Sequence, residues 1–304
     1  MTLINLNQAV LNALVFFSKN RPARLNLSQY KMPLVIGSGN AYNTGAILFS
    51  GRPMILASES TLTDTIKNYS QLIKNKTIDA AIIISASGGK DSVWELELAK
   101  KLKLKTHLLT CTAESPAARL ADTVSLYRRL SEPYTYNTST YLGMILSQTQ
   151  EEPKDILSAI KKIKPNKNLK NYSAYAFVLP DRFAAIVEML NIKGRELFGP
   201  NLVFAAYTVG QARHAKFVQP SEKELVISLG VENKYFGEKK SRWDIKLPKK
   251  AQPGLLLALS YYITGLIQEQ KPPYFKKHIQ NFCQDYGPKA YGKKEKFDLI
   301  VPGN

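Results

Sequence analysis

The stretch Ala80–Ser92, AAIIISASGGKDS, indicates how the chain folds. Its first five residues are apolar and mostly β-branched, which is typical of a strand that is buried on both faces of a sheet. A loop of small residues follows directly, and the sequence VWELELAKKLK after it predicts a helix over 93–103. A buried strand, a glycine-containing turn and a helix make a βα unit, and the N–H groups of such a turn can hold a phosphate.

Similar units lie on both sides of this stretch. Short apolar runs alternate with helical patterns throughout the chain: PLVIG, MILA, THLLT and TVSLY before residue 130, and AYAFVLP, LVFAAY, ELVISLG and WDIKLP after residue 170. This alternation predicts an α/β fold with parallel sheets. At 304 residues the chain is long enough for two domains. We expect an N-terminal helix in 1–30, a first domain over 31–150, a helix and linker over 151–170, and a second domain with C-terminal helices over 171–304.

The cysteines and the apolar segments indicate the compartment. Cys111 and Cys283 are too few for a disulfide framework, so we expect thiols in a reducing compartment, the cytoplasm. The first 20 residues lack the basic segment and cleavage site of a signal peptide. The longest apolar stretch, 254–267, is too short and too polar to span a bilayer, so no membrane partner is expected.

The net charge of +18 points to anionic partners. The lysines are scattered along the chain rather than aligned on one helix face or interleaved with aromatic residues. We therefore favour a solvated basic surface that attracts small phosphorylated substrates over a nucleic-acid site.

Two glycine-rich loops are candidates for holding a phosphate. GSGNAYNTG at Gly37–Gly45 follows the first predicted strand, but Tyr42 stands where a dinucleotide fingerprint requires its third glycine. In the second loop, SGGKDS is similar to the phosphate loop of the PP-loop ATP pyrophosphatases. In that family the loop opens the first βα unit, whereas two βα units precede it here, which argues against a nucleotide.

A second interpretation of SASGGKDS is a variant of Ser-x-Ser-Gly-x-Thr, the phosphosugar signature of SIS (sugar isomerase) domains. Four more segments agree with that family in order: VIGSGNA, ASES, SPAARLAD and SEPYTYNTSTYLGMI. The resemblance covers roughly residues 30–150. It implies two SIS subdomains, each a mainly parallel sheet flanked by helices in a flavodoxin-like three-layer sandwich.

The same resemblance implies a set of phosphate ligands. Hydroxyl groups would come from Ser38, Ser85, Ser87 and Ser92, and Lys90 replaces the family's threonine by a charge that can pair with phosphate. For Ser92 a local helix cap is an equally good explanation.

The second half resembles the isomerase half of glucosamine-6-phosphate synthases. In VEMLNIKGRELFGPNLVFAAYTVGQARHAKFV the resemblance places Glu188 on the first motif's glutamate, Glu196 on the proton carrier and His214 on the ring-opening histidine. Near the end, KPPYFKKHIQ places the catalytic lysine at Lys277, with Lys276 as its competitor.

Part of this second motif departs from the family. Gln211 replaces a glutamate and Ala215-Lys216 replace Gly-Pro. The residues also allow plain structural roles, with Glu196 a helix-surface carboxylate paired with Lys193, and His214 a half-buried structural histidine.

A stand-alone chain with two SIS domains resembles the bifunctional phosphoglucose/phosphomannose isomerases, which need no metal or cofactor and generally form homodimers. The resemblance implies aldose–ketose isomerisation of a hexose 6-phosphate through an enediol. Three alternatives stay open: a deglycase or amino-sugar isomerase, a sugar-phosphate sensor without turnover, and a PP-loop enzyme that binds ATP with Mg²⁺.

Overall fold

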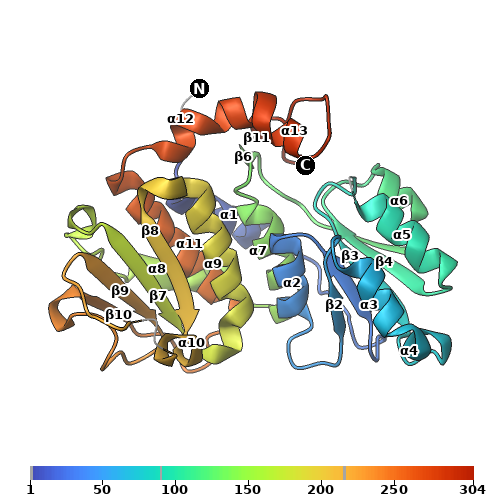
Figure 1. Ribbon diagram of the computed structural model, residues 1–304, viewed down its shortest axis with the longest axis horizontal. Coiled ribbons are helices and arrows are strands. Elements are labelled where there is room, and N and C mark those ends of the chain that lie inside the picture. Colours follow the sequence, from blue (N-terminus) through green and yellow to red (C-terminus); the bar gives the residue numbers. More distant parts are fainter. Residues whose placement is uncertain (1–2, 90, 215–216) are drawn as a thin grey trace. The chain divides into compact units, whose positions relative to one another are not determined.

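The computed structural model describes residues 3–89, 91–214 and 217–304. The chain is an α/β protein with two compact units (Figure 1). The N-half unit comprises Asn20–Arg129, Thr140–Gln150 and Asn304. The C-half unit comprises the chain up to Lys19, Leu130–Ser139 and Glu151–Gly303. This division differs from the expected boundaries, because the first helix and the segment Leu130–Ser139 both belong to the C-half unit.

A five-stranded parallel sheet forms the centre of the N-half unit, in the order β2-β1-β3-β4-β5. The strands are β1 (Leu34–Gly37), β2 (Ile55–Ala57), β3 (Ala80–Ile84), β4 (Lys105–Thr110) and β5 (Thr123–Leu126). β1 and β3 are neighbours, with Ile36 opposite Ile83. The chain leaves β1 toward one edge of the sheet and β3 toward the other, so the topological switch point lies between them.

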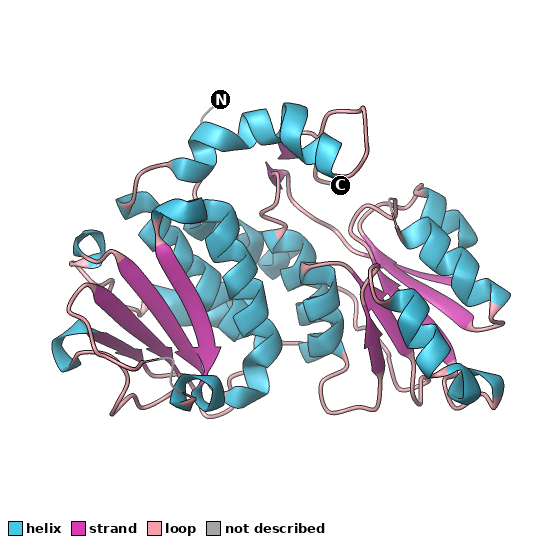
Figure 2. Cartoon of the chain, viewed as in Figure 1, coloured by secondary structure: helices cyan, strands magenta, loops and turns pink. Residues whose placement is uncertain are grey.

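Helices cover both faces of this sheet (Figure 2). They are α2 (Asn40–Leu48), α3 (Leu62–Asn68), α4 (Ser70–Lys74), α5 (Ser92–Lys101), α6 (Pro116–Leu120) and α7 (Thr138–Thr149). On one face, Leu62 of α3 and Leu96 of α5 belong to the same apolar core cluster as Ile36. On the other face α2 lies close to β1, where a Cβ added at Gly45 would be 2.7 Å from a methyl carbon of Val35.

The sheet of the C-half unit has four parallel strands in the order β10-β9-β7-β8. They are β7 (Ala174–Leu179), β8 (Val203–Thr208), β9 (Glu224–Leu229) and β10 (Arg242–Ile245). After β7, the carboxylate of Asp181 accepts a hydrogen bond of 2.7 Å from the Gly210 N–H, and this bond lowers the pKa of Asp181. In the C-half unit, the Gly210 N–H at the start of α10 is therefore already bonded to Asp181.

The helices of the C-half unit are α1 (Leu6–Lys19), α8 (Pro153–Lys161), α9 (Ala184–Phe198), α10 (Val209–Arg213), α11 (Pro253–Gln270), α12 (Tyr274–Asn281) and α13 (Gly287–Ala290). A π-helical turn, Phe282–Tyr286, joins α12 to α13, and β6 (Glu132–Pro133) pairs antiparallel with β11 (Ile300–Val301). The α9 helix covers one face of the sheet, where Gly194 lies against the ring of Phe204. On the other face Ala212 of α10 packs with Val178.

The first helix, α1, packs against α11. Its buried side chains recur at helical spacing: Leu6, Ala9, Val10, Ala13, Leu14 and Phe17. The two helices touch at Gly265, where an added Cβ would lie 1.9 Å from the backbone nitrogen of Asn7. The N–H of Leu6 donates to Oε1 of Gln268 at 2.8 Å. The hydrophobic core of the C-half unit is therefore completed by two helices, α1 and α11, that are far apart in the sequence.

The expected α/β class, with parallel sheets flanked by helices, is confirmed. Within residues 3–89, 91–214 and 217–304, none of the helices combines the length and the apolar content that crossing a membrane requires.

Candidate functional site

The loop Ser85–Asp91 joins β3 to α5 at the switch point of the N-half sheet. Ser38 follows the neighbouring strand β1 and is exposed just before α2 begins. Asn40, the first residue of α2, has a buried side-chain oxygen without a hydrogen-bond partner among the described residues. The carboxyl ends of two adjacent strands thus place Ser38 and the loop at one edge of the sheet, where α/β proteins bind ligands.

The three loop serines have different surroundings. The Ser85 hydroxyl accepts the N–H of Gly88 at 3.2 Å, and that of Ser87 accepts the N–H of Gly89 at 3.4 Å. Ser87 is exposed and Ser85 is partly exposed. The Ser92 side chain is buried, and its hydroxyl donates to the Gly89 carbonyl at 2.7 Å. Ser85 and Ser87 can therefore turn toward a ligand, whereas Ser92 fastens the loop. Lys90 lies outside the described residues.

A second segment, the SPAARLAD sequence, contacts the loop at Gly88. The N–H of Ala117 donates to the Gly88 carbonyl at 3.0 Å, and the Ser115 hydroxyl caps α6 by accepting the N–H of Ala118. Gly88 has φ of +58°, and a Cβ there would lie 2.0 Å from the Ser115 hydroxyl oxygen. Glycine is needed at this position because both the left-handed backbone and the contact exclude a side chain.

Substituting Gly88 tests this arrangement. Gly88→Ala is expected to lower the free energy of unfolding by about 2 kcal/mol, from backbone strain and displacement of Ser115, and to weaken the binding of inorganic phosphate at the loop at least tenfold. Urea unfolding and titration calorimetry measure the two effects. Gly89→Ala is the matched control, because its Cβ would meet only the Ser87 hydroxyl, at 3.8 Å. Equal losses of stability and binding in the two variants would contradict the conclusion that Gly88 in particular must be glycine.

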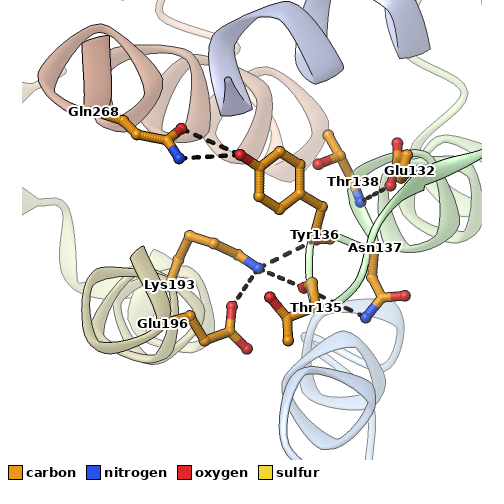
Figure 3. A network of polar contacts seen from close by, with 8 residues as sticks. All are labelled: Glu132, Thr135, Tyr136, Asn137, Thr138, Lys193, Glu196 and Gln268. Atoms are coloured by element: carbon orange, nitrogen blue, oxygen red, sulfur yellow. Dashed lines mark hydrogen bonds and ion pairs between the residues drawn. The ribbon is translucent and has the colours of Figure 1, made fainter. Parts of the chain in front are cut away.

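Glu196 and Lys193 form an ion pair near the end of α9 in the C-half unit (Figure 3). Nζ of Lys193 is 2.6 Å from the Glu196 carboxylate and also donates to the backbone carbonyls of Thr135 and Tyr136, at 2.7 and 3.2 Å. The Lys193 side chain is fully buried, whereas 26% of the Glu196 side chain is exposed. The ion pair between Glu196 and Lys193 that the sequence analysis considered is present, but it is not a surface pair because Lys193 is buried.

The segment Glu132–Thr138, which Lys193 contacts, has an unusual backbone. Thr135 and Asn137 have φ of +72° and +48°, values that are rare for residues other than glycine. The Glu132 carboxylate accepts the N–H groups of Thr138 and Ser139 at the start of α7, at 2.6 and 2.8 Å. Burial raises the pKa of Glu132, and those hydrogen bonds oppose the rise. Strain of this kind persists only where the surroundings fix it, and it is often found at functional sites.

Tyr136 connects this segment to the helices around it. Its hydroxyl donates to the carbonyl of Ile4 at 3.0 Å and is hydrogen-bonded to the Gln268 side chain, while its ring packs against Phe275 of α12. Lys193 Nζ lies 6.0 Å from the centre of the Tyr136 ring. Figure 3 shows the Lys193 side chain reaching from α9 to the backbone carbonyl groups of the segment, while Gln268 is hydrogen-bonded to the hydroxyl end of the Tyr136 side chain.

His214 is placed far from Glu196 within the chain. Asn191 of α9 is hydrogen-bonded to the backbone of Ala206, so β8 runs back along the helix. His214 is exposed and follows α10, beyond the carboxyl end of β8, where α9 begins. Glu196 lies near the other end of α9, a helix of 15 residues and hence roughly 20 Å long. One copy of the chain does not bring the two side chains together.

The two candidate lysines lie on α12. This helix starts against the end of α9, since a Cβ at Gly199 would lie 2.3 Å from the Tyr274 ring. Lys277 is exposed and Lys276 is partly exposed. The ammonium group that the described structure pairs with Glu196 is that of Lys193 instead.

Lys193 was not assigned a functional role from the sequence, although a signal was present. It continues the spacing of Ile186, Leu190 and Leu197, which are the buried positions of α9. A lysine on an apolar helix face is buried only if its ammonium group is paired, so its position itself indicates a polar centre.

The comparisons with known proteins concern the fold. No profile of a known family and no curated protein matches the sequence. The C-terminal domain of glucosamine-fructose-6-phosphate aminotransferase from Francisella tularensis matches with a TM-score of 0.57 and 13% identity, over 86% of this chain and 93% of that chain. Tagatose-6-phosphate ketose/aldose isomerase from Escherichia coli matches with a TM-score of 0.57 and 12% identity, over 88% of this chain and 92% of that chain.

A third solved structure, glucosamine-6-phosphate deaminase from Thermotoga maritima, matches with a TM-score of 0.56 and 15% identity, over 86% of this chain and 92% of that chain. All three matches extend over both units. The chain thus has the fold of the SIS-domain proteins, as the sequence resemblance predicted.

Proposed function

We propose that the protein is a phosphosugar isomerase that interconverts the aldose and ketose forms of a hexose 6-phosphate. The observation that carries the proposal is Glu196, a partly exposed carboxylate held by a fully buried ammonium group. A carboxylate held in one position suits a base that must remove a proton from carbon. The SIS fold and the loop at the switch point of the N-half sheet support a phosphosugar as substrate.

The proposed chemistry conserves all protons. Glu196 takes the proton from C2 of the aldose, an enediolate forms, and Glu196 returns the proton to C1, while a second proton moves from O2 to O1. The ammonium group of Lys193, 2.6 Å from the Glu196 carboxylate, fixes the orientation of that carboxylate. In the N-half unit, Ser38, Ser85, Ser87 and Lys90 would hold the phosphate, together with the N–H groups at the start of α5.

Ring opening is assigned to His214, and Lys277 or Lys276 would stabilise the developing negative charge. Because His214 and Glu196 lie at opposite ends of α9, the histidine would have to come from a second copy of the chain. This requirement supports the proposed homodimer. If His214 takes no part, the alternative is a sugar-phosphate sensor without turnover.

The first experiment is a turnover assay. Fructose 6-phosphate in deuterium oxide should yield glucose or mannose 6-phosphate that carries deuterium at C2, which NMR detects. Tagatose 6-phosphate and glucosamine 6-phosphate belong in the same panel, because similar structures are named for these sugars. Binding without turnover would indicate a sensor. A melting temperature raised by ATP with Mg²⁺ and by none of the sugars would indicate the PP-loop alternative.

A further inference from the structure

Glu95 is a buried carboxyl group in the helix that follows the loop Ser85–Asp91. We call this loop, which is proposed to bind the phosphate of the substrate, the phosphate loop. Glu95 lies in the first turn of α5, three residues after Ser92, and side chains at this spacing share one helix face. Ser92 in turn is bonded to the loop at Gly89. The Glu95 side chain is 3% exposed, and its Oε1 atom has no hydrogen-bond partner in the described structure. A buried carboxylate without a partner is costly, so the neutral acid is favoured.

Two other acidic residues, Asp91 and Glu59, interact electrostatically with Glu95. Asp91, at the start of α5, accepts a hydrogen bond from the Trp94 ring N–H at 3.2 Å. Glu59, after β2, has one buried oxygen that is likewise unpartnered among the described residues. Burial first, and then Asp91 and Glu59, raise the pKa of Glu95 to about 7.

Two other helices of the N-half unit carry further charges. Helix α6, which packs on α5, carries Arg119, and α3, which shares an apolar core cluster with α5, carries Asp64 and Lys67; all three side chains are exposed. None of them is among the groups that shift the pKa of Glu95. Within residues 3–89, 91–214 and 217–304, the causes of the raised pKa of Glu95 are its burial and the two acids Asp91 and Glu59.

We infer that the phosphate loop binds its anion together with a proton, and that Glu95 is the group that takes up this proton. The inference rests on the proposed phosphate site. A phosphosugar bound at the loop would bring two negative charges to the N-terminal end of α5, where Glu95 lies in the first turn. These charges disfavour the carboxylate form further, so binding draws a proton onto Glu95.

Titration calorimetry at pH 8 tests the inference. Fructose 6-phosphate is injected in Tris and in HEPES, whose ionisation enthalpies differ, so that the difference in heat reports protons exchanged. The sugar phosphate is already a dianion at pH 8, since its second pKa is about 6, so any proton taken up goes to the protein. We expect uptake approaching one proton per site. Glu95→Gln should abolish it, whereas Glu97→Gln, an exposed neighbour on the same helix, should leave it unchanged.

The affinity provides a second measurement. A group with a pKa of about 7 is only about one-tenth protonated at pH 8, whereas glutamine is always neutral. Glu95→Gln should therefore bind fructose 6-phosphate about tenfold more tightly than the parent at pH 8, with the difference disappearing near pH 6.

The folding stability tests Glu95 without any ligand. A carboxyl group whose pKa is raised on folding stabilises the protein below its unfolded pKa and loses that contribution as the pH rises through 7. Glu95→Gln should thus raise the urea midpoint at pH 8 and leave it unchanged near pH 4.5.

The possible failures are distinguishable. Absence of binding in the parent would overturn the phosphate site, and this inference with it. Binding without proton uptake, or uptake that persists in Glu95→Gln, would overturn the inference and leave the proposed function standing.

Discussion

Replacing Glu196 with glutamine is expected to lower the turnover of fructose 6-phosphate at least a thousandfold. Glutamine keeps the shape of the side chain and can still accept a hydrogen bond from Lys193, but it cannot take a proton from carbon. General base catalysis contributes typically 10²–10⁴-fold, and here no neighbouring carboxylate on α9 replaces it. The measurement is the rate of deuterium incorporation at C2, with the KM determined in the same assay.

The matched control is Glu188→Gln. Glu188 is on the same helix and is exposed, so its loss should leave turnover within a factor of two. A parent enzyme that turns over substrate while Glu196→Gln retains most of its rate would remove Glu196 from the mechanism. Equal losses in both variants would instead assign the effect to α9 as a whole.

Lys193→Ala is expected to lower the free energy of unfolding by about 3–5 kcal/mol, the range for breaking a buried ion pair on one side. The substitution leaves the carbonyl groups of Thr135 and Tyr136 buried without their donor, and it leaves a cavity between the Tyr136 and Tyr261 rings. It also releases the strained segment that the ammonium group holds. Urea unfolding at pH 7, followed by far-UV circular dichroism, measures the loss.

Two further variants separate the causes. Lys193→Met fills most of the cavity but supplies no donor, so it should recover only the packing part of the loss. Arg195→Ala removes an exposed cation from the same helix and should change stability by less than about 0.5 kcal/mol. If Lys193→Ala were as mild as Arg195→Ala, the lysine would not be holding the Glu132–Thr138 segment.

The sequence was sufficient for the sheets. Runs such as Ala80–Ile84 are apolar and β-branched, and the structure contains a buried strand at that place. The loop between β3 and α5 was also predictable, because small residues follow the apolar run directly and a helical pattern begins after them. Both features depend on residues that are adjacent in the chain, which is the range over which local patterns are informative.

The contacts made by residues distant in sequence were not predictable in the same way. Lys193 finds its partners in Thr135 and Tyr136, more than 55 residues earlier. His214 was carried over with Glu196 from one resemblance, but the distance between them depends on β8 running back along α9. Alignment to a motif gives the order of residues and leaves their separation to the fold.

The contact between α1 and α11 has a consequence for the synthesis of the chain. Leu6 and its partner Gln268 are separated by 262 residues. At 5–20 residues per second, α11 is made roughly 13–52 s after α1. Helix α8 also packs on α1 and is made before α11, so during this interval it is the part of α1 that contacts α11 that lacks its final partner. The nascent chain therefore exposes part of the apolar face of α1 to chaperones until α11 has been made.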